Sequence, residues 1–374
     1  MKRILSTLLA ALLLLPSLMA QESGDKPPVF TVPKFSGFAI ASYQATFQDD
    51  NNSNTFDLRL VRAAIEGRIL GDFYYKIQGQ INGNPSTLGT SPRLVDYFME
   101  WQKLDYLKVR FGQFKRPFTF ENPMNPIDQG FMSYSQPVSK LSGFSDRSGE
   151  HPSNGRDIGL QLQGDFLKNG DGRNLLHYQV GIFNGQGINV KDVNEEKDII
   201  GGIWVMPIKG MRIGAFGWDG SYARKDAAGD VVSLAQHRYA LSAEYKKGNL
   251  QLRTEYIHST GRGFATTYKN ADTKDVTIKT YTDADGNPVA NDKADGFYAL
   301  AIVPVVGDKL MAKARYDIYR PTASTVAAKT NYEVGLNYQF CKYLELQTEY
   351  VLTNDRSLAK HNYSSVYVQL SIRY

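Results

Sequence analysis

The sequence predicts an all-β fold: a transmembrane, up-and-down antiparallel β-barrel of about 16 strands, with a long third loop folded into the lumen. Three observations lead to this prediction. Apolar and polar residues alternate with a period of two along most of the chain, as in strands that bury one face. Short and long connections alternate between these runs, as in outer-membrane barrels. The chain also begins with a segment typical of export.

The composition excludes several other classes of protein. Hydrophobic residues make up 42% of the 374 residues, but the mean hydropathy is only −0.37. A bundle of membrane helices would instead contain repeated apolar runs of about 20 residues. A single Cys excludes a disulfide scaffold and a Cys-based zinc cluster. The hydrophobic fraction is also too high for a disordered chain.

Residues 1–20 are expected to be a secretory signal peptide. Lys2 and Arg3 precede an apolar run from Ile4 to Met19, and Ala20 is a suitable cleavage residue. An uncleaved anchor helix is the alternative, although the run is short for a membrane span. Because the segment holds two basic and no acidic residues, its removal lowers the net charge from +5 to +3. A short N-terminal segment, 21–34, then precedes a barrel over 35–374.

Sixteen alternating runs follow one another in the predicted barrel. In one of them Phe73, Tyr75 and Ile77 alternate with polar neighbours such as Lys76 and Gln78. The second run changes phase near Val61, which suggests a β-bulge. The expected strands span 35–48, 55–70, 72–82, 93–104, 106–115, 156–166, 174–184, 197–207, 210–220, 236–247, 249–260, 294–305, 308–320, 330–341, 342–353 and 362–374.

The connections between these runs alternate in length. Tight links lie near Gly71, Asp105, Gly210, Gly248 and Gly307, whereas the longer ones cover 49–54, 83–92, 116–155, 185–196, 221–235, 261–293, 321–329 and 354–361. In a barrel of this kind the short turns face the periplasm and the long loops face outward. A soluble β-sandwich fits sixteen regular strands without a helix less well. A β-propeller would show a motif that repeats about every 40 residues, and the sequence has none.

A membrane barrel reverses the usual distribution of apolar residues, because they face lipid while polar residues face the lumen. The 23 Tyr and 19 Phe then supply aromatic girdles at the two membrane interfaces. The C-terminal run places Val366, Val368, Leu370, Ile372 and Tyr374 on one face. This aromatic end resembles the assembly signal of bacterial outer-membrane proteins.

Several short segments, in this order, resemble the phosphate-selective porin O/P family of bacterial outer-membrane porins. They are KFSGF (34–38), GQFKRPF (112–118), NGRDIG (154–159), FNGQG (183–187), GWDGSY (217–222), LRTEYI (252–257), ARYD (314–317) and GLNYQF (335–340). The resemblance covers about 340 residues and is closest in style to Bacteroidetes members. It implies a homotrimeric porin of sixteen strands, a third loop folded into the pore, and passive uptake of small anions such as phosphate.

The connection over 116–155 is the candidate constriction loop. It is the longest connection, contains two Asn-Pro pairs, and shows no helix or strand pattern of its own. Loops of this length without secondary structure are usually functional or disordered. Folded inward, it would narrow the aqueous channel that sixteen strands leave. The alternative is a flexible loop that points outward.

Charges predicted to face the lumen are nearly balanced, so any anion selectivity must be local. Ten are basic and nine are acidic: Lys76, Lys108, Arg110, Arg212, Arg238, Lys246, Arg253, Lys313, Arg315 and Arg373 against Asp96, Glu100, Asp165, Glu244, Glu255, Asp317, Glu333, Glu345 and Glu349. The pore-lining candidates for anions are Lys108, Arg110, Lys115, Arg116, Arg147 and Arg156, opposed by an acidic wall of Asp96, Glu100, Glu345 and Glu349. Alternatively, these cations pair with nearby acids and only hold the loop.

No enzymatic site is expected. The five His are scattered without metal-ligand spacing, and no G-x-S-x-G element occurs. The segment from Asp283 to Pro288 lacks the spacing of a calcium loop and is interpreted as the tip of an outward hairpin. We therefore expect neither cofactor nor metal, no nucleic-acid partner, and contact with outer-membrane lipid and lipopolysaccharide. The main hypothesis is a porin for small anionic or hydrophilic solutes; the alternative is a barrel-anchored surface protein whose long outer loops bind a partner.

Overall fold

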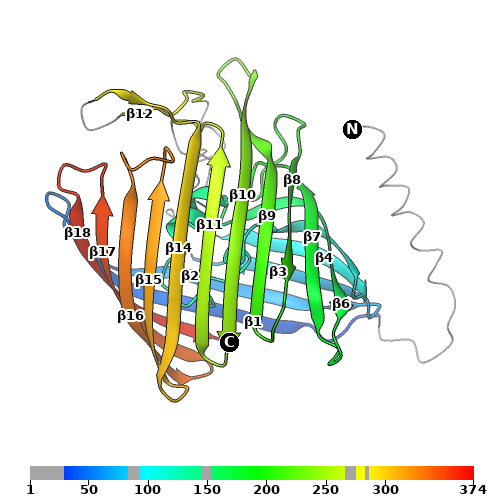
Figure 1. Cartoon of the computed structure of the whole chain (residues 1–374). Coiled ribbons are helices and arrows are strands. Elements are labelled where there is room, and N and C mark those ends of the chain that lie inside the picture. Colours follow the sequence, from blue (N-terminus) through cyan, green and yellow to red (C-terminus); the bar gives the residue numbers. More distant parts are fainter. Residues whose placement is uncertain (1–28, 83–91, 145–152, 266–274, 283–285) are drawn as a thin grey trace.

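The computed structural model describes residues 29–82, 92–144, 153–265, 275–282 and 286–374. It shows a single closed β-barrel with long connections at one end and tight turns at the other (Figure 1). The expected signal peptide, 1–20, and the pore candidate Arg147 lie outside the described residues. No helix in the described part of the chain is long and apolar enough to cross a membrane.

Sixteen antiparallel strands form the barrel, which confirms the predicted fold class. They are β1 (Lys34–Phe47), β2 (Ser53–Ile69), β3 (Phe73–Gln80), β4 (Arg93–Leu104), β5 (Leu107–Lys115), β6 (Arg156–Lys168), β7 (Asn174–Phe183), β8 (Asp198–Val205), β9 (Met211–Lys225), β10 (Val231–Lys247), β11 (Leu250–Thr260), β14 (Lys293–Val306), β15 (Leu310–Arg320), β16 (Lys329–Cys341), β17 (Leu344–Asp355) and β18 (Asn362–Arg373). Each strand pairs with its neighbours in sequence, and β1 pairs with β18 to close the cylinder.

Alternation along each strand separates a lipid face from a lumen face. On β17, Tyr350 and Leu352 are 47% and 41% exposed on the outside, while Gln347 and Glu349 are 2% and 3% exposed on the inside. The same division recurs around the barrel, where the exposed large side chains are mostly aromatic or aliphatic and the buried ones are often charged. The polar average of the sequence therefore combines two faces of opposite character.

The predicted irregularity in the second strand is a bulge two residues before Val61. The pairing register of β1 with β2 shifts so that Ile40 faces Leu60 and Ala41 faces Leu58, which leaves Arg59 as the extra residue. The Arg59 guanidinium donates to Gln369 across the barrel seam, and Leu60 is buried against the loop residue Ile127. Two successive side chains of β2 thus point into the lumen.

Two predicted connections differ from the structure. Strands β9 and β10 continue beyond the expected ends, so the predicted loop 221–235 shrinks to 226–230. The extension is stabilised because Tyr222 packs against Phe264 of the neighbouring long connection. In that connection Tyr281–Thr282 (β12) pairs with Pro288–Val289 (β13), which agrees with the predicted hairpin, although 283–285 lie outside the described residues.

The long third loop folds into the barrel. Its described parts, 116–144 and 153–155, contain some of the most buried apolar side chains of the molecule, including Phe118, Phe131 and Val138. The expectation that the loop lacks secondary structure is wrong, because Gln136–Leu141 forms a short helix, α2, that contacts β11, β14 and β15. Ser135 caps it by accepting a bond from the Val138 amide, and Pro137 suits the first turn.

Candidate functional site: the constriction of the lumen

A buried ion pair joins the two ends of the constriction loop. Arg116 and Asp157 are 1% and 0% exposed, and the Arg116 Nη2 atom lies 3.0 Å from Asp157 Oδ2. The guanidinium also lies over the Trp218 ring, 4.9 Å from its centroid. Gly143 approaches so closely that a Cβ atom there would lie 1.8 Å from Arg116 Nη1, and its φ of +85° also favours glycine. Arg116 therefore fixes the base of the loop and does not face open water.

Carboxylates on distant strands accept hydrogen bonds from the backbone of this loop. Glu255 of β11 accepts from the amides of Phe120 and Glu121, both at 2.8 Å. Glu349 of β17 accepts from the amide of Met132 at 2.7 Å. In the same way Asp317 of β15 accepts from the amide of Gln136 at 2.8 Å. A loop without a sheet partner needs such acceptors, and charged acceptors form the stronger bonds.

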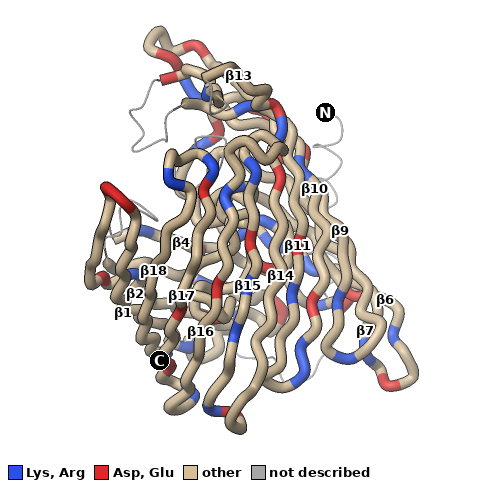
Figure 2. Tube along the Cα trace, turned by 60° about the vertical axis from the view of Figure 1, so that its left-hand side comes forward, with Lys and Arg blue, Asp and Glu red and all other residues tan. Residues whose placement is uncertain are grey.

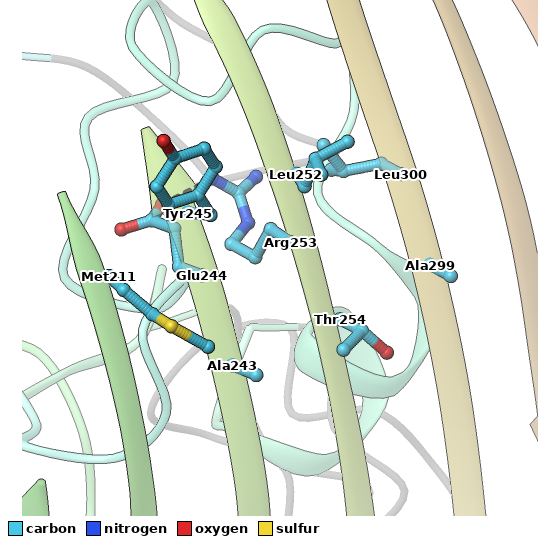
Figure 3. A pocket seen from close by; sticks show the side chains of 9 residues that line it. All are labelled: Met211, Ala243, Glu244, Tyr245, Leu252, Arg253, Thr254, Ala299 and Leu300. Atoms are coloured by element: carbon cyan, nitrogen blue, oxygen red, sulfur yellow. Dashed lines mark hydrogen bonds and ion pairs between the residues drawn. The ribbon is translucent and has the colours of Figure 1, made fainter. Parts of the chain in front are cut away.

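Cations on the same strands satisfy the loop carbonyls. Arg315 donates to the Ser133 carbonyl at 2.9 Å and Lys313 to the Gly130 carbonyl at 3.1 Å. Arg253 of β11 donates to the Gln129 carbonyl at 3.1 Å. Figure 3 shows Arg253 next to Glu244 of β10, and these two side chains form an ion pair at 3.4 Å. These bonds hold the loop to β11 and β15, the two strands on either side of β14.

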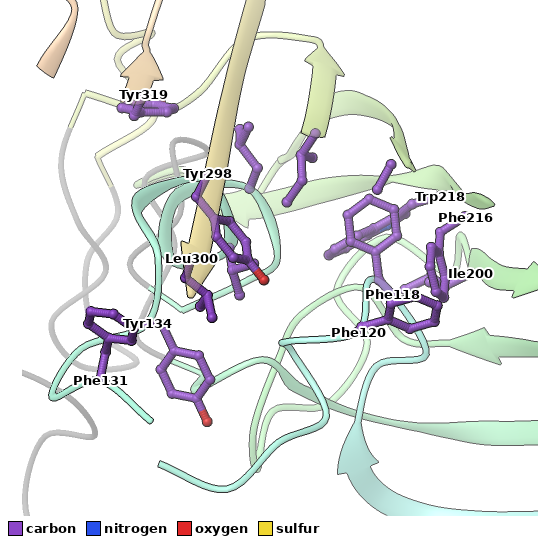
Figure 4. Packing of buried hydrophobic residues seen from close by; sticks show 14 of the residues in the cluster. Phe118, Phe120, Phe131, Tyr134, Ile200, Phe216, Trp218, Tyr298, Leu300 and Tyr319 are labelled. Atoms are coloured by element: carbon purple, nitrogen blue, oxygen red, sulfur yellow. The ribbon is translucent and has the colours of Figure 1, made fainter. Parts of the chain in front are cut away.

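Aromatic packing fills the space between the loop and the wall. Phe118 meets Trp218 edge to face at 5.5 Å between ring centroids, and Phe120 meets Phe216 at 5.4 Å. Figure 4 shows these rings together with Ile200 in one cluster. Edge-to-face aromatic pairs contribute about 0.5–1.5 kcal/mol beyond the burial of their area. Inward-facing aromatics of β8 and β9 thus form the apolar seat of the loop.

The predicted basic candidates on β5 form ion pairs with their neighbours along the wall. The Arg110 Nε atom lies 2.5 Å from Glu100 Oε2, and Lys108 Nζ lies 3.6 Å from Asp165 Oδ2. The side chains of Arg110 and Lys108 are 24% and 26% exposed, so both still reach the lumen. Charges of both signs are spread along the strands in this way (Figure 2).

The two candidates next to the loop lie deeper. Arg156 forms a two-pronged pair with Asp96, with nitrogen–oxygen distances of 2.7 and 2.9 Å. Lys115 directs its ammonium to the carbonyl oxygens of Asn122 and Met124 and to the Tyr134 hydroxyl. Lys115 and Arg156 lie close enough to interact electrostatically, together with Asp96. Of the five predicted basic residues that the structure describes, Lys115 and Arg156 thus lie close together, while Arg116 lies at the base of the loop with Asp157.

The expected acidic wall opposite the basic patch does not have that arrangement. Asp96 and Glu100 lie on β4, beside the basic residues, and pair with Arg156 and Arg110. Glu349 is bound to Lys313 at 2.6 Å and to the loop, while Glu345 accepts from its neighbour Gln347. Side-chain alternation places all four acids in the lumen, but it cannot show which strands lie opposite one another.

Two arginines of β2, Arg59 and Arg62, are missing from the sequence-based candidates. Arg62 is 0% exposed, and its Nε, Nη1 and Nη2 atoms have no hydrogen-bond partner among the described residues. It lies over the Phe38 ring at 5.7 Å and close to the charges of Arg59, Arg156 and Asp96. The phase change near Val61 was the available signal, because it marks the bulge that turns Arg59 inward.

The described residues contain no group of three or more His, Cys, Asp or Glu side chains that could hold a metal ion. His177 is bonded to Asp165 at 2.8 Å and stacks on Trp204. These contacts indicate that His177 packs on the lumen wall as a structural side chain. The site is therefore a constriction made of ion pairs and aromatic rings.

Comparison with known proteins gives a consistent picture. Residues 38–196 match the family model of phosphate-selective porin O and P. No curated protein matches the chain. The fold is similar to an anion-selective porin from Comamonas acidovorans, with 14% identity, a TM-score of 0.62, and coverage of 92% of this chain and 99% of that chain.

Two further solved structures share the fold. The outer membrane channel DcaP of Acinetobacter baumannii is 14% identical, with a TM-score of 0.59 over 94% of this chain and 100% of that chain. The trimer form of in-vitro folded OmpT of Vibrio cholerae is 11% identical, with a TM-score of 0.57 over 92% of this chain and 99% of that chain. The chain therefore has the β-barrel fold of outer-membrane porins, and its residues 38–196 match the phosphate-selective porin O and P family model.

Proposed function

We propose that this porin lets small hydrophilic solutes diffuse passively and that it favours anions. The supporting observation is the buried Arg62 guanidinium, whose three nitrogens have no hydrogen-bond partner among the described residues. A buried charge without partners is costly, and Arg62 acts on an anion in the adjoining lumen through its positive field. Rings or clusters of Arg and Lys favour anions at a constriction.

The charges near the constriction loop also support a preference for anions. Arg62, Lys115 and Arg156 interact electrostatically with one another around the loop and with Asp96. Arg59 lies close to Arg62 and to the acid Glu349. We propose that these four cations attract anions, while Lys108 and Arg110 add a weaker field along β5 because each faces an acid. The anion-selective porin from Comamonas acidovorans has the same fold and offers a precedent for such selectivity.

The reversal potential in a potassium chloride gradient tests this proposal. We expect chloride to be more permeant than potassium in the wild type, and Arg62→Gln to move the reversal potential toward the potassium value. Arg110→Gln is the matched control on the lumen wall, and its shift should be smaller because Glu100 already neutralises that arginine. A cation-selective wild type, or equal shifts in the two variants, would contradict the proposal.

Phosphate as a preferred anion is a separate part of the proposal, tested by block of the chloride current. Millimolar inorganic phosphate should reduce the current in the wild type and reduce it less in Arg62→Gln. Absence of block would leave a general anion-preferring pore. The alternative of a surface-binding protein is weakened because the described parts of loop 116–155 are buried inside the barrel.

We further propose that the porin assembles as a homotrimer in contact with outer-membrane lipid and lipopolysaccharide. The trimer form of the similarly folded OmpT of Vibrio cholerae supports this assembly. Light scattering of the detergent-purified protein should give three times the chain mass after detergent correction. A monomeric mass with intact conductance would contradict the trimer but leave the channel function unaffected.

A further inference from the structure

A second polar feature of the lumen lies apart from the arginine cluster. It is a cavity of about 180 Å³ between the constriction loop and the wall formed by β16, β17, β18 and β1. Ser133 contributes from the loop, and the cavity includes none of the basic residues proposed above to attract anions. Tyr363 lies one residue from the start of β18, at the end of the barrel that carries the long connections. The cavity therefore belongs to the outer vestibule.

Hydroxyl groups dominate the lining of this cavity. Thr46, Ser133, Thr353, Tyr363, Ser365 and Tyr367 all contribute to it. A hydroxyl can both donate and accept a hydrogen bond, whereas Arg and Lys only donate and carboxylates only accept. Thr46 and Ser365 are bonded to each other and Thr353 donates to Asn331, but each hydroxyl oxygen can accept a further bond. The lining thus still offers donors and acceptors to a solute with several hydroxyls.

The charged side chains at the cavity are already neutralised. Lys329 lies 3.6 Å from Asp355 and also donates to the Tyr363 hydroxyl at 2.8 Å. Glu333 accepts from Arg315 Nη2 at 2.8 Å. An ionic solute would gain little from charges that already have partners, so the lining favours a neutral solute over an anion or a cation.

We propose that this cavity binds a neutral, polyhydroxylated solute about the size of one sugar ring, before the solute passes the constriction. Its volume is below the roughly 300–1,000 Å³ of pockets for drug-sized ligands, which limits the occupant to a small molecule. Ser133 is exposed and belongs to the loop, so a bound solute would rest directly beside the narrow part of the pore.

Current fluctuations of single channels in the presence of D-glucose test this inference. We expect glucose to add noise to the chloride current. This noise should saturate as the glucose concentration rises, because it reports the occupancy of one site. The double variant Thr353→Val/Ser365→Ala should raise the half-saturating concentration about fivefold or more, because it removes two hydroxyl partners. Ser371→Ala, a buried lumen hydroxyl of β18 outside the cavity, is the matched control and should leave it unchanged.

Noise that rises without saturation, or that saturates equally in the double variant, would overturn the inference. Inorganic phosphate that displaces glucose at equal concentration would instead assign the cavity to anions. Unchanged single-channel conductance of the double variant in plain salt, together with its heat-shifted gel mobility, would show that it still folds. The reversal potential is measured separately, so failure here and failure of anion preference remain distinguishable.

Discussion

The two sides of the lumen use the same alternating pattern for different purposes. The anchoring wall, β8–β11 with β14 and β15, meets the loop with aromatic rings and with carboxylates such as Glu255 that accept its amides. The open wall, β1 and β2 with β16–β18, also contacts the loop, for example through Glu349, but it lines the hydroxyl-rich cavity and contains the buried Arg62 guanidinium, which has no hydrogen-bond partner among the described residues. Polar lumen residues thus bind the loop backbone on the anchoring wall, while on the open wall several of them line a cavity instead.

Removing one of the carboxylates that hold the loop on the anchoring wall should have the largest effect on stability and conductance. Besides the two loop amides, Glu255 accepts from Ser242 and Tyr298 at 2.5 and 2.6 Å. Glu255→Leu leaves these buried donors without an acceptor and should cost about 3–5 kcal/mol of stability. The loop should detach, raising single-channel conductance and lowering the temperature at which the folded band disappears on gels.

Glu345→Leu is the matched control, since Glu345 lies on β17 and accepts only from Gln347 among the bonds identified. It should leave conductance and melting nearly unchanged. Equal effects of the two variants would mean that the loop is held by its ends and not by the wall.

Shortening an apolar anchor should weaken the same wall by a different route. Phe118 is 0% exposed and packs against Trp218 and Phe216. Phe118→Ala should cost about 3–4 kcal/mol, because it removes buried area and leaves a cavity under the loop. Thermal unfolding measures the loss, and Phe118→Leu should recover more than half of it. No difference between Ala and Leu would show that the loop collapses into the gap.

A substitution on the open wall should have the smallest effect on stability, and replacing Arg62 should cause little or no loss. Arg62→Gln removes a buried charge whose nitrogens have no partners among the described residues. We expect stability to stay within about 1 kcal/mol of the wild type or to increase, since an uncompensated buried charge is itself costly. The unfolding midpoint in guanidinium chloride measures this. A loss of several kcal/mol would show that Arg62 supports structure in the way Arg253 does.

The strands could be predicted from sequence because lipid imposes one rule on every outward face. For example, β4 spans Arg93–Leu104, as the alternation predicted, and the β2 bulge appeared as a change of phase. The loop could not be predicted in the same detail. The six-residue helix α2 is too short to show a helical period, and its position depends on contacts with β11, β14 and β15.

The site was predictable only in part for a related physical reason. Alternation places Asp96 and Arg110 in the lumen, but pairing depends on which strands are neighbours and where the loop runs. Arg156 therefore pairs with Asp96, 60 residues away, whereas the sequence alone predicts that it faces an acidic wall across the pore. Alternation alone does not predict the inward side chain of Arg59, because the bulge reverses the phase of the strand at that point.

The loop's backbone acceptors have a consequence for the order of assembly. The loop follows β5, yet Glu255, Asp317 and Glu349 lie on β11, β15 and β17, more than 100 residues later in the chain. Contacts this far apart in sequence form late, because long stretches of chain must be ordered first. A barrel that has not received its last strands cannot yet hold its own constriction. Narrowing of the channel therefore marks the completed cylinder, and an unfinished one would be wider and leakier than the mature pore.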